Sequence, residues 1–282
     1  MKEVASFWYS KNLKSSLGGG ILDKLAFKKN VNNCGLSSLE ILCIKSFIDN
    51  NFTFTLYTYD KNNELFNRLQ KELKNFYVKD ANEIVDFSEY FDDNRGAGVA
   101  AFSDYFRFRM INKSNVAWVD TDMLCLKEFD LSDYVVITQA GSDGHLSPTT
   151  SMLKYPQNSE LANYLIDESK KIIAGKKMVE WGVIGPVFLA RAIKELKLEH
   201  ILKEQEYACA INWADYQYFT SASYIDFPQN SVCAHLWTEM WKGFRGLPAI
   251  NKDIKAPFNS IYERYKRKHN IYEFLEKLSY KL

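Results

Sequence analysis

The chain has 282 residues, of which 46% are hydrophobic and 15% aromatic, and this composition can build a sizeable core and excludes a disordered protein. Its 36 basic and 35 acidic residues give a formal net charge of +1, which argues against a nucleic-acid partner held by a large basic surface. The N-terminus lacks the apolar region of a signal peptide, and no segment approaches the roughly 18 apolar residues of a membrane helix.

Cysteine usage favours a reducing compartment. The five cysteines are odd in number, widely spaced and mostly inside apolar runs, without a Cys-x-x-Cys pair: Cys34, Cys43, Cys125, Cys209 and Cys233. Structural disulfides are rare in the cytosol. We therefore expect a reduced, cytoplasmic protein.

Strands and helices alternate in the first 120 residues. Hydrophobic periodicity predicts strands at 4–9, 52–60 and 115–120 and helices at 36–50, 63–77 and 98–111. Such alternation is typical of α/β proteins with a mostly parallel sheet, in which ligands bind beyond the carboxyl ends of the strands.

The pattern changes after about residue 140. The turn-rich segment 139–151 contains Gly141, Gly144 and Pro148 and is predicted to be a loop. Two helices are expected at 159–174 and 185–196, the second entered through Pro186, and the tail from residue 259 is helical in pattern. The chain shows no internal repeat or clear linker, so we expect one compact domain with a C-terminal helical annex.

The stretch NVAWVDTDMLCL places Asp120 and Asp122 between two apolar runs. Side chains at i and i+2 of an extended segment point to the same side, so the two carboxylates converge. Repelling carboxylates are tolerated when a hard divalent cation lies between them, and open coordination positions would suit phosphate oxygens. A solvated turn after a strand is the alternative, since so short a motif often matches by chance.

A second charged pair precedes this motif. Asp104 and Arg107 are three residues apart and share one face of the predicted helix 98–111. On its own such a pair is most simply a surface ion pair, worth roughly 0.2–0.5 kcal/mol. The short loop after the helix would carry the pair beside Asp120 and Asp122, which favours a charged site.

Two chemistries use an Asp-x-Asp at a strand end. An aspartyl-phosphate phosphatase would need a hydroxyl residue where Leu124 stands and a later acidic pair, which the segment GSDGH does not provide. The other chemistry is sugar transfer from a nucleoside diphosphate, in which a metal held by the motif neutralises the departing diphosphate. The phosphatase is the weaker alternative.

The residues carry a resemblance to a known family. The segment FSDYFRFRMINKSNVAWVDTDMLCL, residues 102–126, resembles the helix and strand of the DXD-containing retaining glycosyltransferases. That group includes capsule and lipopolysaccharide sugar transferases, clostridial glucosylating toxins and Golgi α-1,4 sugar transferases. The segments FWYSK, WGVIGPVFLARAIKEL and CAHLWTEMW and the βα unit at 36–60 agree with the family in order.

The resemblance covers most of residues 1–245 and implies a fold. It predicts a single α/β domain of the GT-A (Rossmann-like) type over 1–245 with a mostly parallel central sheet. The C-terminal extension 246–282, here called the annex, would pack on the same domain.

The resemblance also implies roles on the donor side. Trp8 is similar to the aromatic residue that stacks on the nucleotide base, although a core aromatic on a buried strand is an equal alternative. Asp104 and Arg107 match the pair that hydrogen-bonds hydroxyls of the donor sugar, and Arg107 is grouped with the catalytic residues.

The remaining site residues surround the implied cation. Asp122 is expected to ligate Mn²⁺ or Mg²⁺ directly, and Asp120 to hold ribose or sugar hydroxyls and to contribute to the metal site, both counting as catalytic. His235 would complete the metal shell, against the alternative of a satisfied core histidine. Trp237 would lie on the same side as His235 and offer its indole N–H to the leaving diphosphate.

The implied activity is metal-dependent transfer of a hexose or N-acetylhexosamine from a UDP-sugar to a hydroxyl of a glycan or lipid-linked acceptor. Synthesis of bacterial surface polysaccharide is the expected context, and retention of configuration follows from the resemblance alone. The alternative is a non-catalytic carbohydrate- or nucleotide-binding module on the same fold. Nucleotide-sugar turnover separates the two.

Three features depart from the family pattern. The segment 12–35, with Gly18 to Gly20, is an expected insertion near the site, and KSNVA replaces the usual Gly-Gly before the motif. The family's asparagine after the large loop is not evident, and Thr149, Thr150 or Ser151 is expected to substitute for it on the acceptor side.

The tail combines basic and aromatic residues: Arg264, Lys266, Arg267 and Lys268 with Tyr262, Tyr265 and Tyr272. This composition is compatible with peripheral contact with the inner face of an anionic membrane. A solvated terminal helix packed through its aromatic residues is an equal alternative.

Overall fold

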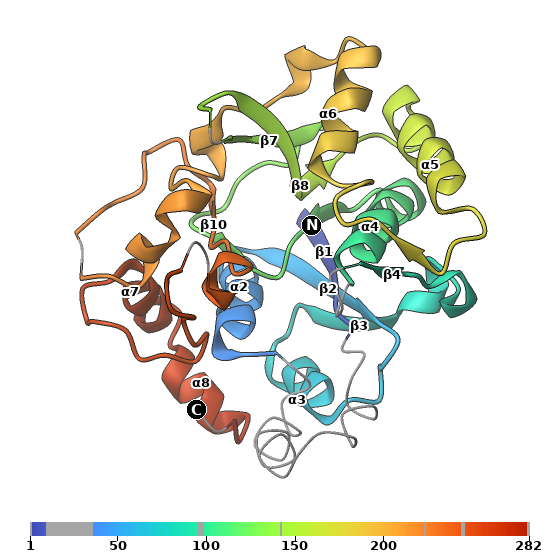
Figure 1. Ribbon diagram of the computed structural model, residues 1–282. Helices are drawn as coiled ribbons and strands as arrows, with labels where there is room; N and C mark the ends of the chain where they lie inside the picture. Colours follow the sequence, from blue (N-terminus) through green and yellow to red (C-terminus); the bar gives the residue numbers. More distant parts are fainter. Residues whose placement is uncertain are drawn as a thin grey trace.

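A computed structural model describes residues 2–9, 36–94, 99–141, 143–222, 224–243 and 246–280. A central sheet is covered by helices on both faces (Figure 1). Gly18 to Gly20, in the expected insertion, lie outside the described residues.

The sheet has six strands in the order β3-β2-β1-β5-β8-β7. They are β1 (Lys2–Phe7), β2 (Phe52–Thr58), β3 (Phe76–Asp80), β5 (Ala117–Val119), β7 (Val135–Ala140) and β8 (Leu146–Lys154). β1 pairs parallel with β2 and β5, β2 pairs parallel with β3, and β8 runs antiparallel to β5 and β7. The predicted α/β fold with a mostly parallel sheet is confirmed.

Each face of the sheet has its own hydrophobic core. Val4 and Ala5 of β1 are both fully buried but belong to different cores, because successive strand residues point to opposite faces. One face carries α2 (Ser38–Asp49), α3 (Glu64–Glu72), α7 (Ile261–Lys268) and α8 (Ile271–Lys277). The other carries α4 (Ala100–Ser114), α5 (Glu160–Ile173) and α6 (Pro186–Glu195).

Two short sheets complete the walls of the site. β6 (Met123–Cys125) follows β5 and pairs antiparallel with β10 (Cys233–His235). β4 (Asp92–Asp93) pairs parallel with β9 (Met178–Val179). Single-turn or short 3₁₀ helices lie at 81–83, 87–89, 199–201, 205–207, 213–219 and 240–242.

Two predicted elements were wrong. The helix expected at 63–77 ends at Glu72, and residues 76–80 form β3, whose alternating burial is that of an edge strand. The loop expected at 139–151 is a β-hairpin, because its glycines form only the turn, with the Gly141 N–H donating to the His145 carbonyl at 2.9 Å. Pro148 is tolerated in β8 beside a register irregularity, at a point where β5 does not reach.

The tail residues that suggested membrane contact are bound to the protein itself. Lys266 is fully buried, donates to the Ile254 carbonyl at 2.8 Å and lies over the rings of Tyr262 and Tyr272. Arg264 pairs with Asp226 at 2.7 Å. The remaining two donate to backbone carbonyls, Arg267 to Phe258 and Lys268 to Leu126.

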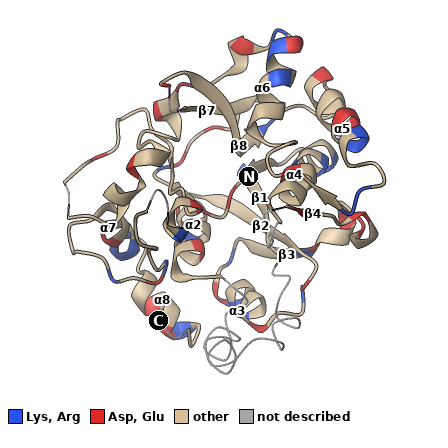
Figure 2. Ribbon diagram, in the orientation of Figure 1, with Lys and Arg blue, Asp and Glu red and all other residues tan. Residues whose placement is uncertain are grey.

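Charges of both signs alternate over the outer helices in Figure 2, without a single-sign stripe in that view. Cys43, Cys125, Cys209 and Cys233 are buried free thiols. Among the described residues, no helix has the length and apolar character required to span a bilayer.

Candidate active site

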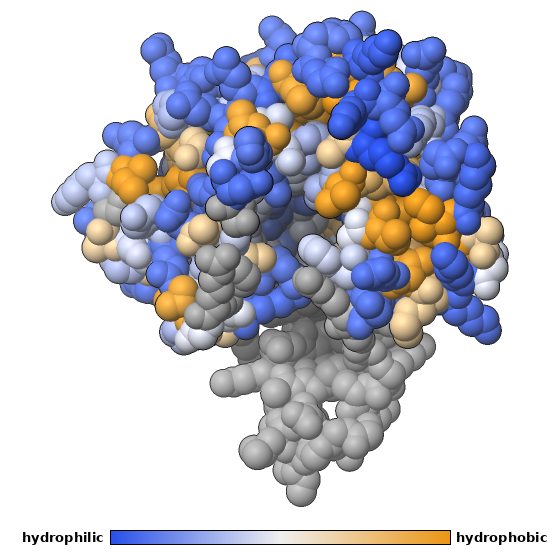
Figure 3. Space-filling model, turned by 45° about the horizontal axis from the view of Figure 1, so that its top comes forward, coloured by the Kyte–Doolittle hydropathy of each residue, from blue (hydrophilic) through white to orange (hydrophobic). Residues whose placement is uncertain are grey.

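A cavity of about 520 Å³ opens beyond the carboxyl ends of β1 and β5. Its walls come from the residues after β1, the inner face of α4, the turn between β5 and β6, strand β8, the loop before α6 and the segment after β10. Figure 3 shows the hollow at the centre of one face of the molecule. All seven residues predicted for the site line this cavity: Trp8, Asp104, Arg107, Asp120, Asp122, His235 and Trp237.

The Asp-x-Asp segment is a tight turn between two buried strands. β5 ends at Val119, the Met123 N–H donates to the Asp120 carbonyl at 3.0 Å, and β6 begins at Met123. The Asp120 N–H donates to the Ser151 carbonyl of β8 at 2.7 Å, which fixes the turn on the sheet. The apolar exit of the motif is therefore explained by β6 and its partner β10.

Asp120, Asp122 and His235 converge on one point. Each offers a ligand atom, and these atoms lie within 4.8 Å of one another. The Oδ2 atom of Asp122 accepts from the backbone N–H and hydroxyl of Thr238, at 3.0 and 2.9 Å, which orients the carboxylate. Two carboxylates suit Mn²⁺ or Mg²⁺, and the imidazole can complete a Mn²⁺ shell, so the donor set fits the predicted cation and favours manganese.

Asp122 and His235, whose side chains are largely shielded from solvent, shift each other's pKa. Nε2 of His235 lies 3.4 Å from Oδ1 of Asp122. Burial alone would lower the pKa of His235, but the charge and hydrogen bond of Asp122 outweigh it and raise that pKa to about 10. Burial likewise opposes ionisation of Asp122, yet the imidazolium holds the pKa of that carboxyl well below its usual range.

Arg107 forms ion pairs with two carboxylates of the site, Asp104 and Asp120. Its Nε lies 3.3 Å from Asp104 Oδ1, and its Nη1 lies 3.1 Å from Asp120 Oδ1. The guanidinium also donates to the carbonyls of Ser103 and Thr150 and stacks over the Trp118 ring at 4.6 Å. Most of its donors are thus used within the protein, where they hold the two carboxylates beside each other.

Asp104 is a buried carboxylate on this side, 8% exposed. Its Oδ1 accepts from the Thr150 hydroxyl at 2.9 Å. Burial raises the pKa of Asp104 to about 6, against the opposing effects of Arg107 and Thr150. A Cβ at Gly185 would lie 3.0 Å from Asp104 Oδ2, so the Gly-Pro segment approaches this carboxylate as closely as a glycine allows.

The two tryptophans differ in what the structure shows. Trp8 follows β1, is partly buried and lines the cavity. The Trp237 ring lies against the His235 ring, with centroids 3.7 Å apart and planes tilted by 36°, but its indole N–H donates to the Ile211 carbonyl at 2.9 Å. The expected extended segment ends at His235, because β10 stops there and Trp237 has a positive φ of 57°. The prediction that the Trp237 N–H meets a diphosphate was wrong, because this N–H donates to the Ile211 carbonyl instead.

Thr149, Thr150 and Ser151 all line the cavity from β8. Sequence reasoning missed Thr238 on Asp122 and the pair formed by Glu40 and Lys252, which also lines the cavity. Thr238 lies in the quoted CAHLWTEMW segment and could have been found there. Glu40 and Lys252 are 212 residues apart, and no local pattern links them.

No family model matches the chain, and no curated protein matches it in sequence. It resembles solved structures of low identity. The apo-form glycosyltransferase GlyE of Streptococcus pneumoniae is 14% identical over 98% of this chain and 63% of that chain, with a TM-score of 0.49. The galactosyltransferase LgtC, in complex with donor and acceptor sugar analogues, is 9% identical over 95% of each chain, with a TM-score of 0.47.

A third solved structure, the PaToxG glycosyltransferase, is 13% identical over 69% of each chain, with a TM-score of 0.45. All three are glycosyltransferases. At these identities the likeness concerns the fold, and an assignment of reaction must come from the residues of the cavity.

Proposed function

We propose that this protein is a metal-dependent glycosyltransferase. It moves a hexose or N-acetylhexosamine from a UDP-sugar to a hydroxyl of a glycan or lipid-linked acceptor, with retention of configuration. One observation carries the proposal: Asp104 and Asp120 lie in the same cavity and are both paired with Arg107. Nε of Arg107 lies 3.3 Å from Asp104 Oδ1, and Nη1 lies 3.1 Å from Asp120 Oδ1.

The two carboxylate sites would bind different parts of the donor. Asp120, Asp122 and His235 would hold Mn²⁺ or Mg²⁺. When bound, the cation supplies positive charge that stabilises the departing diphosphate. Thr238 keeps Asp122 oriented for this contact through its two hydrogen bonds.

The sugar would lie on the other side of Arg107. Asp104 is buried at the base of that side, and its carboxylate accepts hydrogen bonds from sugar hydroxyls. Trp8, which also lines the cavity, would stack on the uracil base. The hydroxyls of Thr149, Thr150 and Ser151 line the wall from which an acceptor would approach.

The test is nucleotide release from a panel of UDP-, GDP- and CMP-sugars, with manganese and with chelator. We expect release from one UDP-sugar that requires the metal and is lost in Asp122→Ala. Asp133→Ala, at an exposed carboxylate outside the cavity, is the matched control and should behave as wild type. The anomeric configuration of the product, read by NMR, tests retention.

The same panel distinguishes the competing function. Binding of a nucleotide-sugar without release from any donor would move the assignment to a non-catalytic module. Release that continues in chelator and in Asp122→Ala would remove the metal from the proposal.

A further inference from the structure

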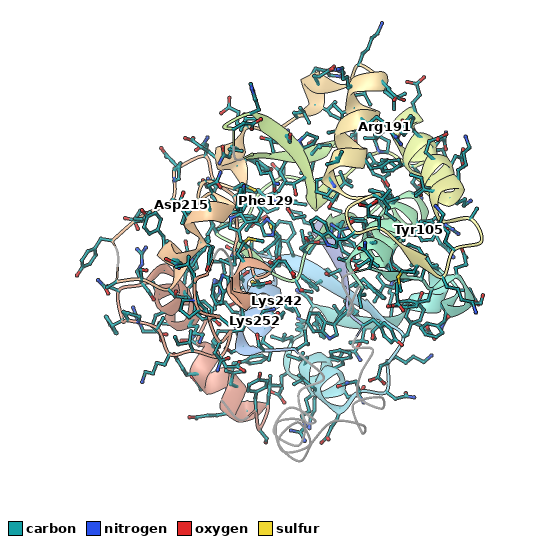
Figure 4. The ribbon with its side chains drawn as sticks, in the orientation of Figure 1. Tyr105, Phe129, Arg191, Asp215, Lys242 and Lys252 are labelled. Atoms are coloured by element: carbon teal, nitrogen blue, oxygen red, sulfur yellow. The ribbon has the colours of Figure 1, made fainter. Side chains whose placement is uncertain are left out.

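The annex contributes a positively charged side chain, that of Lys252, to the wall of the cavity. Lys252 lies in a turn before α7 and lines the cavity together with Asp122 and His235. Figure 4 labels it in the middle of the molecule, close to Lys242. Residue 252 belongs to the annex, in which no site residue was predicted.

Glu40 holds this lysine. The Glu40 side chain is 1% exposed and forms an ion pair through Oε1 with the Lys252 ammonium. Its other oxygen, Oε2, accepts from the Ser37 N–H at 2.8 Å and from the Ser37 hydroxyl, in the capping box that begins α2. The carboxylate that orients Lys252 is therefore itself fixed by a helix start.

A set of hydrogen bonds fastens the turn of Lys252 to the same helix start. Asp253 Oδ1 accepts from the Ser38 N–H at 2.7 Å, and the Lys252 carbonyl accepts from the hydroxyls of Ser38 and Tyr262. Near the end of the described chain, the Tyr280 hydroxyl donates to the Leu36 carbonyl at 3.1 Å. The annex is thus tied to α2 at the cavity wall.

Lys252 is charged and lies in the same cavity as the predicted metal ligands. Burial lowers the pKa of Lys252, but Glu40 first and Asp122 next outweigh burial, so that pKa lies above the ordinary value and the ammonium stays charged. The side chain keeps 29% exposure and lines the cavity, so a ligand in the cavity can reach it. Lys242 differs, because its side chain is 70% exposed and pairs with Glu239 at 2.6 Å, where solvent weakens the charge.

We infer that Lys252 binds the diphosphate of the donor nucleotide and that Glu40 is the positioning residue that presents it, so that the annex is a working part of the site. This inference rests on the proposed function for the identity of the anion. The chemistry is that of an ammonium donating charge-assisted hydrogen bonds to phosphate oxygens beside a divalent cation.

The first test measures binding of UDP in the presence of Mn²⁺ by calorimetry on the full chain. We expect Lys252→Ala to weaken UDP binding about tenfold or more, as for the loss of one charge-assisted hydrogen bond. Uridine, which lacks the diphosphate, should bind both proteins equally. Lys277→Ala, at another annex lysine that pairs with a carboxylate but lies outside the cavity, is the matched control and should bind UDP as wild type does.

The second test asks whether Glu40 acts through Lys252. We expect Glu40→Ala to weaken UDP binding and the double variant Glu40→Ala, Lys252→Ala to bind no more weakly than Lys252→Ala alone. Additive losses would show a merely structural role for Glu40 and overturn that part of the inference. Thermal unfolding of each variant identifies any that fail to fold, and Lys252→Arg, which keeps the charge, should recover part of the affinity.

Failure of the inference is distinguishable from failure of the proposed function. If wild type binds UDP with Mn²⁺ and Lys252→Ala binds it equally well, the role of Lys252 is overturned and the glycosyltransferase proposal stands. If wild type binds no nucleoside diphosphate with the metal present, the proposed function falls, and the inference falls with it.

Discussion

Asp122 and His235 form a largely buried pair in which Oδ1 of the carboxylate lies 3.4 Å from Nε2 of the imidazole. Because Asp122 raises the pKa of His235 to about 10, the ring carries two protons at neutral pH. A metal ligand must be a neutral imidazole. We therefore expect Mn²⁺ binding at pH 7 to release about one proton, and the affinity to fall as the pH falls, by about tenfold per unit between pH 8 and 6.

Calorimetry in buffers of different ionisation enthalpy counts the released protons. His235→Ala should bind Mn²⁺ more weakly and release none. His145→Ala, at an exposed histidine outside the cavity, should release as many as wild type. Equal proton release from wild type and His235→Ala would exclude His235 as a ligand.

A second prediction concerns the support of Asp120. The Trp118 indole N–H donates to Asp120 Oδ1 at 2.7 Å, and the ring lies beneath Arg107. Hydrogen bonds to metal-ligating carboxylates fix their orientation, and their loss usually costs tenfold or more in metal affinity. Trp118→Phe, which keeps an aromatic ring in the core, should weaken Mn²⁺ binding by about tenfold.

The matched control is Trp213→Phe, because the Trp213 indole also donates to the protein, to the Ala140 carbonyl at 3.0 Å, and does not line the cavity. Titration of Mn²⁺ with both variants compares them directly. Equal affinities for Trp118→Phe and wild type would mean that Arg107 alone is enough to orient Asp120.

The sheet and the Asp-x-Asp turn were predictable because their signals are local. Asp120 and Asp122 follow a short apolar run, and the carboxyl end of a parallel strand is where ligands bind. The short β3 was missed because the amphipathic pattern of α3 continues in sequence past Glu72, whereas the chain leaves the helix at Leu73, where φ is −110° and ψ is 108°.

The long-range parts of the site were not readable from the sequence. Glu40 resembles an ordinary residue of an N-terminal capping box, and only the fold brings Lys252 to its carboxylate. The indole of Trp237 was assigned to a ligand because nothing local shows that the Ile211 carbonyl lies within its reach. Such contacts depend on tertiary packing, which residue spacing does not encode.

A third prediction uses the close approach of α6 to Asp104. A Cβ added at Gly185 would lie 3.0 Å from Asp104 Oδ2. Asp104 is held by Thr150 and Arg107, so it cannot turn aside without losing those contacts. We expect Gly185→Ala to fold and to lower kcat/KM for the donor about tenfold or more, whereas Val187→Ala, 79% exposed on the same helix, should leave it unchanged. Full activity of Gly185→Ala would show that Asp104 needs no fixed position.

The last prediction concerns the stability cost of Asp104. Its pKa is raised from 3.8 to about 6 by burial, so the folded state binds the proton more tightly than the unfolded state does. Stability from this group is therefore fully present below about pH 4 and is lost as the pH rises to about 6. A shift of about two units corresponds to about 3 kcal/mol, as an upper estimate.

Asp104→Asn removes the charge and keeps the shape, so at pH 7 its free energy of unfolding should exceed that of wild type by up to about 3 kcal/mol. The difference should vanish near pH 4, where wild-type Asp104 is also neutral. Urea unfolding of both proteins at pH 4 and pH 7 in chelator measures it, and donor turnover should fall in the same variant. A stability difference that does not change with pH would mean that Arg107 and Thr150 compensate the buried charge, and the cost of keeping a carboxylate at the base of the sugar site would then be small.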